Sequence, residues 1–154
     1  MELILWRHAE AEPGVDDLER KLTAKGRKQA ARVAGWLNAR LPSRFSVYAS
    51  PAKRAQQTAL ALAHLGPREF VTVAAFSPST RLDTALGALR STDPTRTVVV
   101  VGHQPTLGEL VARLLGSRVD DWPMKKGAVV WLSGKADDER SQVVLRAAIT
   151  PDLV

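Results

Sequence analysis

The segment that most restricts the fold is residues 97–101, where four valines follow one another without a polar residue between them. Side chains of a β-strand point alternately to opposite faces, so a strand that is apolar at every position must be covered on both faces. Such strands occur mainly in parallel sheets with helices packed on each side. The segment therefore predicts a central strand of an α/β protein.

Other apolar runs have the length and composition of strands, and helical spacing separates most of them. We predict strands at residues 2–6, 45–49, 69–73, 97–101, 128–132 and 143–149. The last two strands follow each other without a helix, so we expect them to form a hairpin around residues 133–142. This order predicts a three-layer α/β/α sandwich with a mainly parallel sheet and helices on both faces.

Four stretches show the spacing of apolar residues that is typical of helices. Thr23 is the expected N-cap of the first helix. In the second helix we expect Ser50 as N-cap, Pro51 as the first helical residue and Gly66 as the terminator. Gly116 is expected to end the fourth helix. The apolar positions are Ala30, Val33, Ala34, Leu37 and Leu41 in the first helix, Leu82, Leu86 and Leu89 in the third, and Leu107, Leu110, Val111, Leu114 and Leu115 in the fourth.

The length of 154 residues suits one compact domain, residues 1–154. Lys and Arg total 22 against 16 Asp and Glu, and the net charge of +6 favours acidic partners: phosphates, nucleic acid or an acidic protein surface. Aromatic residues are only 5%, too few for a platform that stacks single-stranded bases. Without cysteine, a signal-peptide pattern or an apolar run of about 20 residues, we expect a cytoplasmic protein with no membrane partner.

Reactive and phosphate-binding side chains follow three of the predicted strands directly. Arg7 and His8 end the first strand, and Arg54 lies in the first turn of the helix that follows the second. Gly102 and His103 end the fourth strand. Ligands of open α/β sheets bind beyond the carboxyl ends of the parallel strands. We therefore expect two histidines and two arginines to meet in one pocket.

A pocket of this composition suits phosphoryl transfer. Each arginine presents a planar fork of donors that matches phosphate oxygens. Main-chain N–H groups at a helix N-terminus, here near residues 50–53, add further donors. A histidine with its ordinary pKa of about 6.5 is a nucleophile near neutral pH. One histidine can attack phosphorus while the other binds a phosphoryl oxygen or assists the leaving group, and this chemistry requires no metal.

Four motifs occur in a fixed order: RHAEAE at residues 7–12, LTAKGRKQA at 22–30, SPAKRAQQTA at 50–59 and VGHQPT at 101–106. Together they resemble the histidine phosphatase superfamily. The short chain and its RHA start are similar to the SixA-type phosphohistidine phosphatases of that superfamily. The resemblance implies a phosphoglycerate mutase-like fold and hydrolysis of phosphohistidine on a protein, without a cofactor or a metal.

The resemblance also implies roles for individual residues. His8 matches the nucleophile that becomes phosphorylated, and Arg7 and Arg54 match the arginines that clamp the phosphate. His103 matches the second histidine of the site. Arg20, just before the LTAKG stretch, is expected to help bind the phosphate. The implied partner is a phosphohistidine-carrying protein, a phosphotransfer or carrier protein. We expect a monomer that does not bind nucleic acid.

One departure from the superfamily concerns the proton donor. Many members that act on small molecules supply a carboxylate after the third strand, whereas residues 74–87 contain no Glu, and Asp83 is their only acid. Positioned acid catalysis contributes about 10²–10⁴-fold, which a sugar alkoxide needs in order to leave. An imidazole can be protonated before it departs. The sequence therefore favours P–N cleavage, and the lack of a long insertion that could form a lid favours a protein substrate.

Two other functions stay open at this point. The first is a phosphatase of small phosphate monoesters, with Asp83 or another acid as the proton donor. The second is a non-catalytic module that binds nucleic acid or polyphosphate through its basic surface. The paired arginine and histidine argue against the second function, because simple electrostatic binding has no use for a nucleophile.

A metal site is the alternative interpretation of the histidines. A zinc site built from His8, His103 and either Glu10 or Glu109 matches no known ligand spacing. The two arginines would also repel a cation. We therefore expect no metal site, and we expect Glu10 and Glu12 to lie in a solvated loop.

The remaining polar residues have simpler interpretations. His64 is expected near a helix end, where a positive charge complements the helix dipole. Lys125 and Lys126 are expected in a solvated turn or at the rim of the pocket, where they would steer an acidic partner. The four tryptophans are expected in or near the core: Trp6, Trp36, Trp122 and Trp131.

Overall fold

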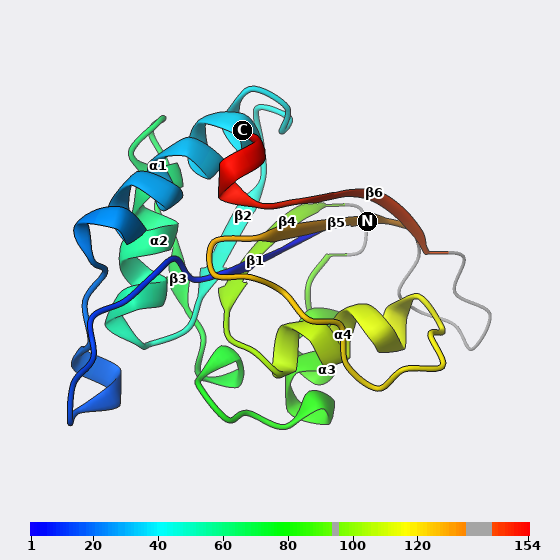
Figure 1. The fold of residues 1–154 in the computed structure, drawn as a ribbon. Helices are drawn as coiled ribbons and strands as arrows, with labels where there is room; N and C mark the ends of the chain where they lie inside the picture. The colour runs from blue at the N-terminus through cyan, green and yellow to red at the C-terminus, as the bar shows by residue number, and fades with distance from the viewer. Residues whose placement is uncertain (94–95, 135–142) are drawn as a thin grey trace.

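The computed structural model describes residues 1–93, 96–134 and 143–154. Six strands form one sheet in the order β3-β2-β4-β1-β5-β6, with helices on both faces (Figure 1). The strands are β1 (Glu2–Arg7), β2 (Ser46–Ala49), β3 (Val71–Thr72), β4 (Thr97–Gly102), β5 (Val129–Ser133) and β6 (Val144–Ile149). The helices are α1 (Ala24–Asn38), α2 (Lys53–Ala63), α3 (Leu82–Arg90) and α4 (Thr106–Leu114), and short 3-10 helices lie at Asp17–Glu19, Ala74–Phe76 and Pro151–Leu153. This is the predicted three-layer α/β/α fold.

The sheet is parallel over four strands, three of which end at the polar motifs. β4 pairs in parallel with β1 on one side and with β2 on the other, and β3 pairs in parallel with β2. β5 is antiparallel to β1, and β6 is antiparallel to β5. The predicted pairing of the last two strands is therefore confirmed, while residues 135–142 of the expected turn lie outside the described residues.

Both faces of β4 are covered, as its valines predicted, because every residue of this strand is buried. Val99 and Val101 belong to the apolar core beneath α1 and α2. Val98 and Val100 belong to the core beneath α3 and α4. Figure 1 shows these two helix pairs on opposite sides of the sheet. Alternate residues of β1 divide between the two cores in the same way.

Three features of the helices and strands refine the sequence predictions. Thr23 is the N-cap of α1, and its hydroxyl accepts a hydrogen bond from Gly26 N at 2.9 Å. The prediction that Ser50 caps α2 is wrong: the helix begins at Lys53 with Ala52 as N-cap. The Ser50 hydroxyl instead bonds Ala52 N and His103, as described below. At the sheet edge, β3 has only two residues, Val71–Thr72, instead of the predicted 69–73, and both are exposed.

The tryptophans lie where the sequence placed them. Trp6 and Trp131 are buried, and Trp36 and Trp122 pack partly buried against the two cores. Gly116 follows the end of α4 with a φ of 61°, the left-handed conformation that glycine adopts most easily. None of the described helices has the length and apolar character that crossing a membrane requires.

Candidate active site

Three neighbouring parallel strands end side by side at the candidate site. The main-chain N–H of His8 donates to the Gly102 carbonyl at 3.0 Å, and Ser50 N–H donates to the Val101 carbonyl at 3.0 Å. These bonds extend the β1–β4 and β2–β4 ladders by one residue. They bring His8, Ser50 and His103 together at the carboxyl edge of the sheet, where α/β proteins bind ligands.

His8 is buried, and its contacts fix which ring nitrogen is free. Nδ1 lies 2.7 Å from the Ala9 carbonyl oxygen. A carbonyl only accepts hydrogen bonds, so Nδ1 carries the hydrogen and Nε2 keeps its lone pair. Nε2 faces Arg54, whose Nε lies 3.4 Å away. The free nitrogen of His8 therefore points into the cluster rather than toward the strand.

Arg54 lies between the two histidines. It comes from the first turn of α2 and is only 4% exposed. Its Nε is 3.4 Å from His8 Nε2, and its Nη2 is 3.4 Å from His103 Nδ1. The two imidazole rings are 5.1 Å apart between centroids. Three of the four side chains that the sequence predicted for the pocket thus form one contiguous group.

Ser50 holds His103 through its other ring nitrogen. His103 Nε2 is 2.7 Å from Ser50 Oγ, which also accepts the N–H of Ala52 at 3.1 Å. Because Arg54 can only donate, Nδ1 of His103 acts as the acceptor toward Nη2, and Nε2–H donates to Ser50. Nδ1 of His103 therefore has a lone pair that can take a proton inside the site.

Arg7 approaches the site from the end of β1. Its Nη1 donates to the Met124 carbonyl, while its Nε is buried without a hydrogen-bond partner among the described residues. A buried donor without a partner is rare in proteins, and this one leaves Arg7 Nε free to donate to a ligand. Gly127 N–H donates to the His8 carbonyl at 3.0 Å, so the loop at residues 124–127 is fastened to the end of β1.

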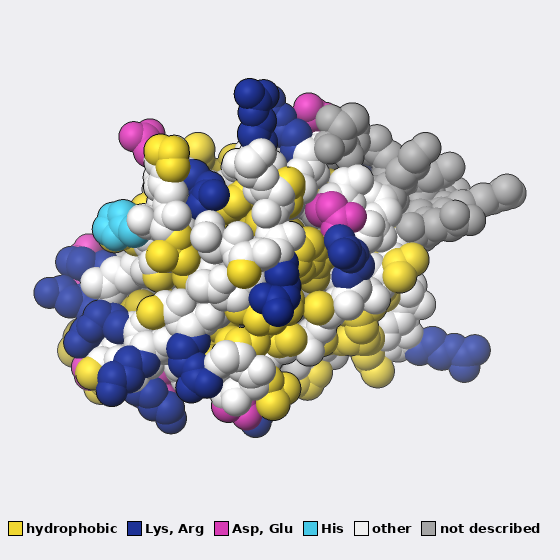
Figure 2. All heavy atoms as spheres, turned by 90° about the horizontal axis from the view of Figure 1, so that it is seen from above, with side chains coloured by type: hydrophobic (Ala, Val, Ile, Leu, Met, Phe, Trp, Pro, Cys, Tyr) yellow, Lys and Arg dark blue, Asp and Glu magenta, His cyan; other side chains and the backbone are white. Residues whose placement is uncertain are grey.

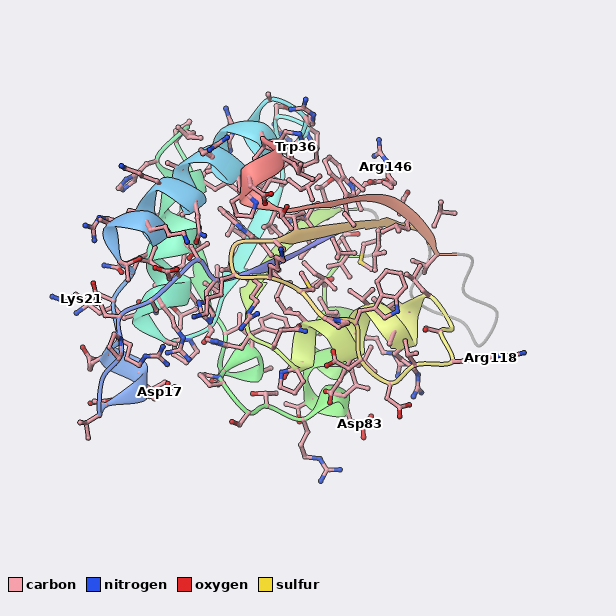
Figure 3. The ribbon with its side chains drawn as sticks, in the orientation of Figure 1. Asp17, Lys21, Trp36, Asp83, Arg118 and Arg146 are labelled. Carbon is pink, nitrogen blue, oxygen red and sulfur yellow. The ribbon has the colours of Figure 1, made fainter. Side chains whose placement is uncertain are left out.

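Asp17 joins Arg54 and Arg20, and it is a site residue that was not predicted from the sequence. Arg54 donates through Nη1 to the Asp17 main-chain oxygen at 2.6 Å and through Nη2 to its Oδ2 at 3.1 Å. Arg20 donates to Asp17 Oδ1 at 3.0 Å and to the Glu12 carbonyl at 2.7 Å. Arg20 therefore reaches the histidines through Asp17, which lies in the 3-10 helix Asp17–Glu19 at the edge of the molecule (Figure 3).

Two further residues of the SPAKRAQQTA motif, Thr58 and Gln57, bond to the main chain of the segment between β1 and α1. Thr58 is fully buried, and its hydroxyl accepts the Ala9 N–H at 3.1 Å and donates to the Arg54 carbonyl at 2.8 Å. Gln57 accepts the Leu22 N–H at 2.7 Å. Arg54 and Thr58 are four residues apart and therefore lie on one face of α2. This spacing is the sequence feature from which contact of Thr58 with the site could have been predicted.

Burial and positive neighbours keep both histidines neutral. Burial first, and then the nearby guanidinium groups of Arg54 and Arg7, lower the pKa of His8 to about 4, despite the opposing hydrogen bond to Ala9. Burial first, and then His8 and Arg54, lower the pKa of His103 to about 3. Burial also lowers the pKa of Arg7. At neutral pH the site therefore combines two neutral imidazoles with charged arginines, which suits an anionic ligand and a nitrogen nucleophile.

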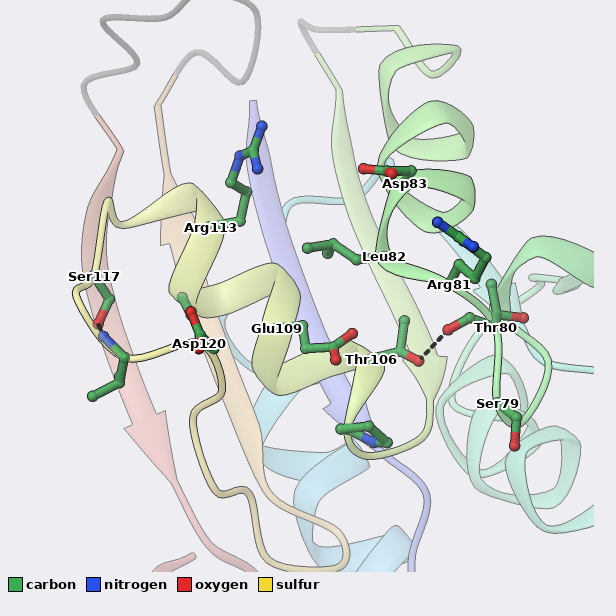
Figure 4. Close-up of a pocket in the computed structure, with 13 residues that line it drawn as sticks. Ser79, Thr80, Arg81, Leu82, Asp83, Thr106, Glu109, Arg113, Ser117 and Asp120 are labelled. Carbon is green, nitrogen blue, oxygen red and sulfur yellow. Dashed lines mark hydrogen bonds between the residues drawn. The ribbon is translucent and has the colours of Figure 1, made fainter.

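Asp83 belongs to a different cavity. It lies in the first turn of α3 and lines a cavity of about 770 Å³ between α3 and α4, together with Glu109. Figure 4 shows Asp83 at the start of α3, and Thr106 of α4 bonded to the Thr80 carbonyl. Neither His8 nor His103 is among the residues that line it.

The other predicted polar residues divide into structural groups and groups near the site. Glu10 accepts the Thr23 hydroxyl at 3.1 Å and is not fully solvated as expected, because it packs against the start of α1. His64 is exposed at the end of α2. Lys125 and Lys126 are exposed and line a cavity with Arg7. No cluster of three or more His, Asp or Glu groups that could hold a metal occurs within the described ranges.

Comparisons with known proteins point to one superfamily. The model of the histidine phosphatase superfamily (branch 1) matches residues 3–77. An uncharacterised protein of Picosynechococcus sp. is 35% identical over 145 residues, which cover 88% of this chain and 87% of that protein. One of Mycobacterium tuberculosis is 36% identical over 110 residues, and these span 68% of this chain and 66% of that relative.

Solved structures agree in fold over nearly the whole chain. The structure of a candidate phosphohistidine phosphatase SixA from Nakamurella multipartitia has a TM-score of 0.79 at 28% identity, with 97% of this chain and 95% of that chain covered. The protein histidine phosphatase SixA in complex with tungstate has a TM-score of 0.83 at 23% identity, with 99% of both chains covered. A mycobacterial glucosyl-3-phosphoglycerate phosphatase shares the fold at a TM-score of 0.74 and 22% identity, covering 95% and 97%. The chain therefore belongs to the histidine phosphatase superfamily, a group of phosphatases, and is of the SixA type.

Proposed function

We propose that this protein hydrolyses phosphohistidine on a protein substrate through a covalent phosphohistidine intermediate on His8. The observation that carries the proposal is the arrangement of Arg54 between His8 and His103, with the Nε2 lone pair of His8 facing the same space. A tetrahedral phosphoryl group needs donors on several oxygens and a nucleophile in line with the leaving group. These side chains supply both.

The first step transfers the phosphoryl group to the enzyme. His8 Nε2 attacks phosphorus while the guanidinium groups of Arg7 and Arg54 donate to its equatorial oxygens, and neutral His103 lies beside them with Nδ1 unprotonated. The P–N bond of the substrate breaks as the new P–Nε2 bond forms. The departing substrate imidazole takes a proton, which can be in place before the bond breaks. Neutral His8 is available for this attack at physiological pH because its pKa is lowered to about 4.

The second step releases inorganic phosphate. Water attacks phosphorus from the side that the substrate left, and the P–Nε2 bond breaks. His103 takes the proton of the water at Nδ1, while Ser50 holds the opposite nitrogen of the ring at 2.7 Å. The resulting imidazolium is stabilised by the phosphate that forms beside it. His8 then regains its neutral form with the hydrogen on Nδ1.

Trapping the intermediate tests the mechanism directly. With a phosphohistidine donor labelled in the phosphoryl group, the wild-type enzyme should yield a phosphoprotein that is labile in acid and stable in alkali, with the label on His8. His8→Ala should abolish both the label and turnover. Arg54→Ala should mainly weaken binding of phosphate and of the transition state. His64→Ala, at an exposed histidine, is the matched control and should behave as the wild type.

Hydrolysis of small phosphate monoesters is the second candidate function, and the cavity that contains Asp83 and Glu109 is the observation that favours it. The rates on a phosphohistidine peptide, an aryl phosphate and a sugar phosphate separate the two functions. The proposal predicts fast cleavage of the peptide and slow cleavage of the sugar phosphate, since no carboxylate bonds to the two histidines among the described residues. A sugar phosphate cleaved as fast as the peptide would favour the second function.

A further inference from the structure

We propose that the basic cavity between α1 and the loop at residues 124–127 binds acidic side chains that flank the phosphohistidine of the protein substrate. The inference rests on the proposed function and extends it, because it assigns a chemistry to the substrate surface around the phosphoryl group. Three cations of α1 and two lysines of the loop carry it, and Arg7 at the end of β1 also lines the cavity.

The cavity is large and strongly basic. Its volume is about 670 Å³, far more than one phosphoryl group fills. The cations that line it are Arg7, Lys25, Lys28, Arg32, Lys125 and Lys126, and Asp152 is the only carboxylate among its lining residues. In the view from above in Figure 2, Lys and Arg side chains gather at the lower left of the surface. A ligand of this cavity must therefore carry several negative charges.

The cavity adjoins the candidate active site at Arg7. Arg7 lines it and also follows β1 directly before His8. Lys126 lies close enough to His8 for its charge to contribute to the lowered pKa of that histidine. The loop is fixed in this place by the bonds from Arg7 to Met124 and from Gly127 to His8. An acidic group in the cavity would therefore belong to the same molecule that presents the phosphoryl group.

Several of these cations lack a close ion-pair partner among the described residues. Among the described residues, Lys28, Lys125 and Lys126 form no ion pair within 4.0 Å. Lys25 lies 3.7 Å from Glu10, with its side chain 72% exposed, so this pair contributes little. Unpaired positive charges at this density repel one another, which an anionic ligand would relieve.

The kind of cation selects the kind of ligand. Three of the unpaired groups are lysines, whose flexible stems carry point charges rather than the fixed fork with which arginine holds a phosphate. They are spread over a helix and a separate loop, so they suit several carboxylates of an extended protein surface better than one compact anion. Charges of this type mainly raise the association rate and select the partner.

Matched peptides test the inference. Two phosphohistidine peptides of equal length, one with Asp and Glu beside the phosphohistidine and one with Asn and Gln there, are compared as substrates. Para-nitrophenyl phosphate serves as a probe that has no second anionic group. The charge-reversed variant is Lys28→Glu with Lys125→Glu, because neither residue contributes to the pKa shift of His8. The control is Arg90→Glu with Arg118→Glu, at exposed residues that do not line the cavity.

The wild type should prefer the acidic peptide about tenfold in kcat/KM, through KM rather than kcat, and the preference should shrink as salt is added. The cavity variant should lose this preference while its rates on the neutral peptide and on para-nitrophenyl phosphate stay within about twofold of wild type. The Arg90 and Arg118 control should retain the preference, and melting temperatures should show that both variants are folded.

Equal use of both peptides by the wild type would overturn the inference, and so would an unchanged preference in the cavity variant. A small bisphosphate preferred over the acidic peptide would also overturn it, because the cavity would then bind a second phosphate. If neither peptide is hydrolysed while para-nitrophenyl phosphate is, the proposed function itself fails, which is a separate outcome from equal hydrolysis of both peptides.

Discussion

The hydroxyl of Ser50 determines which ring nitrogen of His103 can take a proton. It is fully buried, lies 2.7 Å from His103 Nε2 and is itself held by Ala52 N–H. With this nitrogen occupied, the lone pair on Nδ1 is directed toward Arg54 and the site. A histidine that exchanges protons in a reaction needs such a partner on its other nitrogen, because the partner fixes both the tautomer and the orientation of the ring.

Ser50→Ala should therefore slow release of phosphate more than formation of the phosphoenzyme. The substitution removes the hydrogen bond between Ser50 Oγ and His103 Nε2, and His103 is an imidazolium in the second step. Hydrogen bonds to charged groups contribute about 1.5–3 kcal/mol, which corresponds to roughly 10–100-fold in rate. Rapid-quench measurement should show the labelled phosphoenzyme accumulating in the variant. Ser50→Thr, which keeps the hydroxyl, should restore part of the rate. Equal slowing of both steps would mean that Ser50 only supports the structure.

At the scale of elements, the start of α1 is pressed against the loop that carries the nucleophile. A Cβ added at Gly26 would lie 1.9 Å from the Glu10 carbonyl oxygen, which is a main-chain atom. The same carbonyl accepts the N–H of Thr23 at 3.0 Å. The glycine of the LTAKG stretch is thus required by close approach of two backbone segments, and its position fixes the loop after β1 relative to α1.

Gly26→Ala should destabilise the protein even though alanine favours helices. The added methyl group forces the loop away from α1, and overpacking of this kind costs about 1–3 kcal/mol. Gly35→Ala lies in the same helix with nothing within 4 Å of its added Cβ, and it should stabilise the protein by up to about 1 kcal/mol. Urea denaturation of both variants measures the difference. Equal effects of the two substitutions would contradict the close approach.

The sequence predicted elements well where a repeating apolar pattern records their surroundings. Four consecutive valines predicted a strand covered on both faces, and the stripe that ends at Gly116 predicted α4. The capping role of Ser50 was predicted wrongly, because a serine before a helix has the same local pattern whether its hydroxyl caps the helix or bonds a distant histidine. His103 lies 53 residues further along the chain.

The site could be predicted in composition but not in its connections. Residues that directly follow predicted parallel strands must meet at one edge of the sheet, which is why Arg7, His8 and His103 were found. Asp17 lies in a 3-10 helix of only three residues, too short to leave an apolar repeat in the sequence, and only the folded chain brings it to Arg54. Arg20 was expected to bind phosphate. In the structure it bonds to Asp17, which in turn bonds to Arg54.

At the scale of the whole molecule, the two buried histidines connect catalysis with acid stability. Their pKa values are lowered to about 4 and about 3 in the folded protein, against an ordinary value near 6.5. Below pH 6.5 the unfolded chain therefore takes up protons on these histidines that the folded protein does not. Where the unfolded state binds more protons than the folded state, the free energy of unfolding decreases as the pH is lowered. It should therefore decrease as the pH drops from about 6.5 toward 4.

As the pH is lowered from 7 to 5, each buried histidine should reduce the free energy of unfolding by roughly 2 kcal/mol. Urea denaturation at pH 7, 6 and 5 measures this loss. His8→Gln with His103→Gln should show a much smaller decrease over the same range, and His103→Gln alone serves if the double variant does not fold. His64→Gln, at an exposed histidine, is the control. A double variant that loses as much stability as the wild type would exclude the buried histidines as the cause.

The segment that ends the chain has a practical consequence for anyone who handles this protein. Pro151 and Asp152 form part of the wall of the basic cavity, and the main chain of Val154 is tied to α1 by Arg32 at 2.7 Å. Any peptide joined after Val154 emerges next to that cavity. An acidic affinity tag fused there would act as a tethered competitor, so purification tags belong at the other end of the polypeptide.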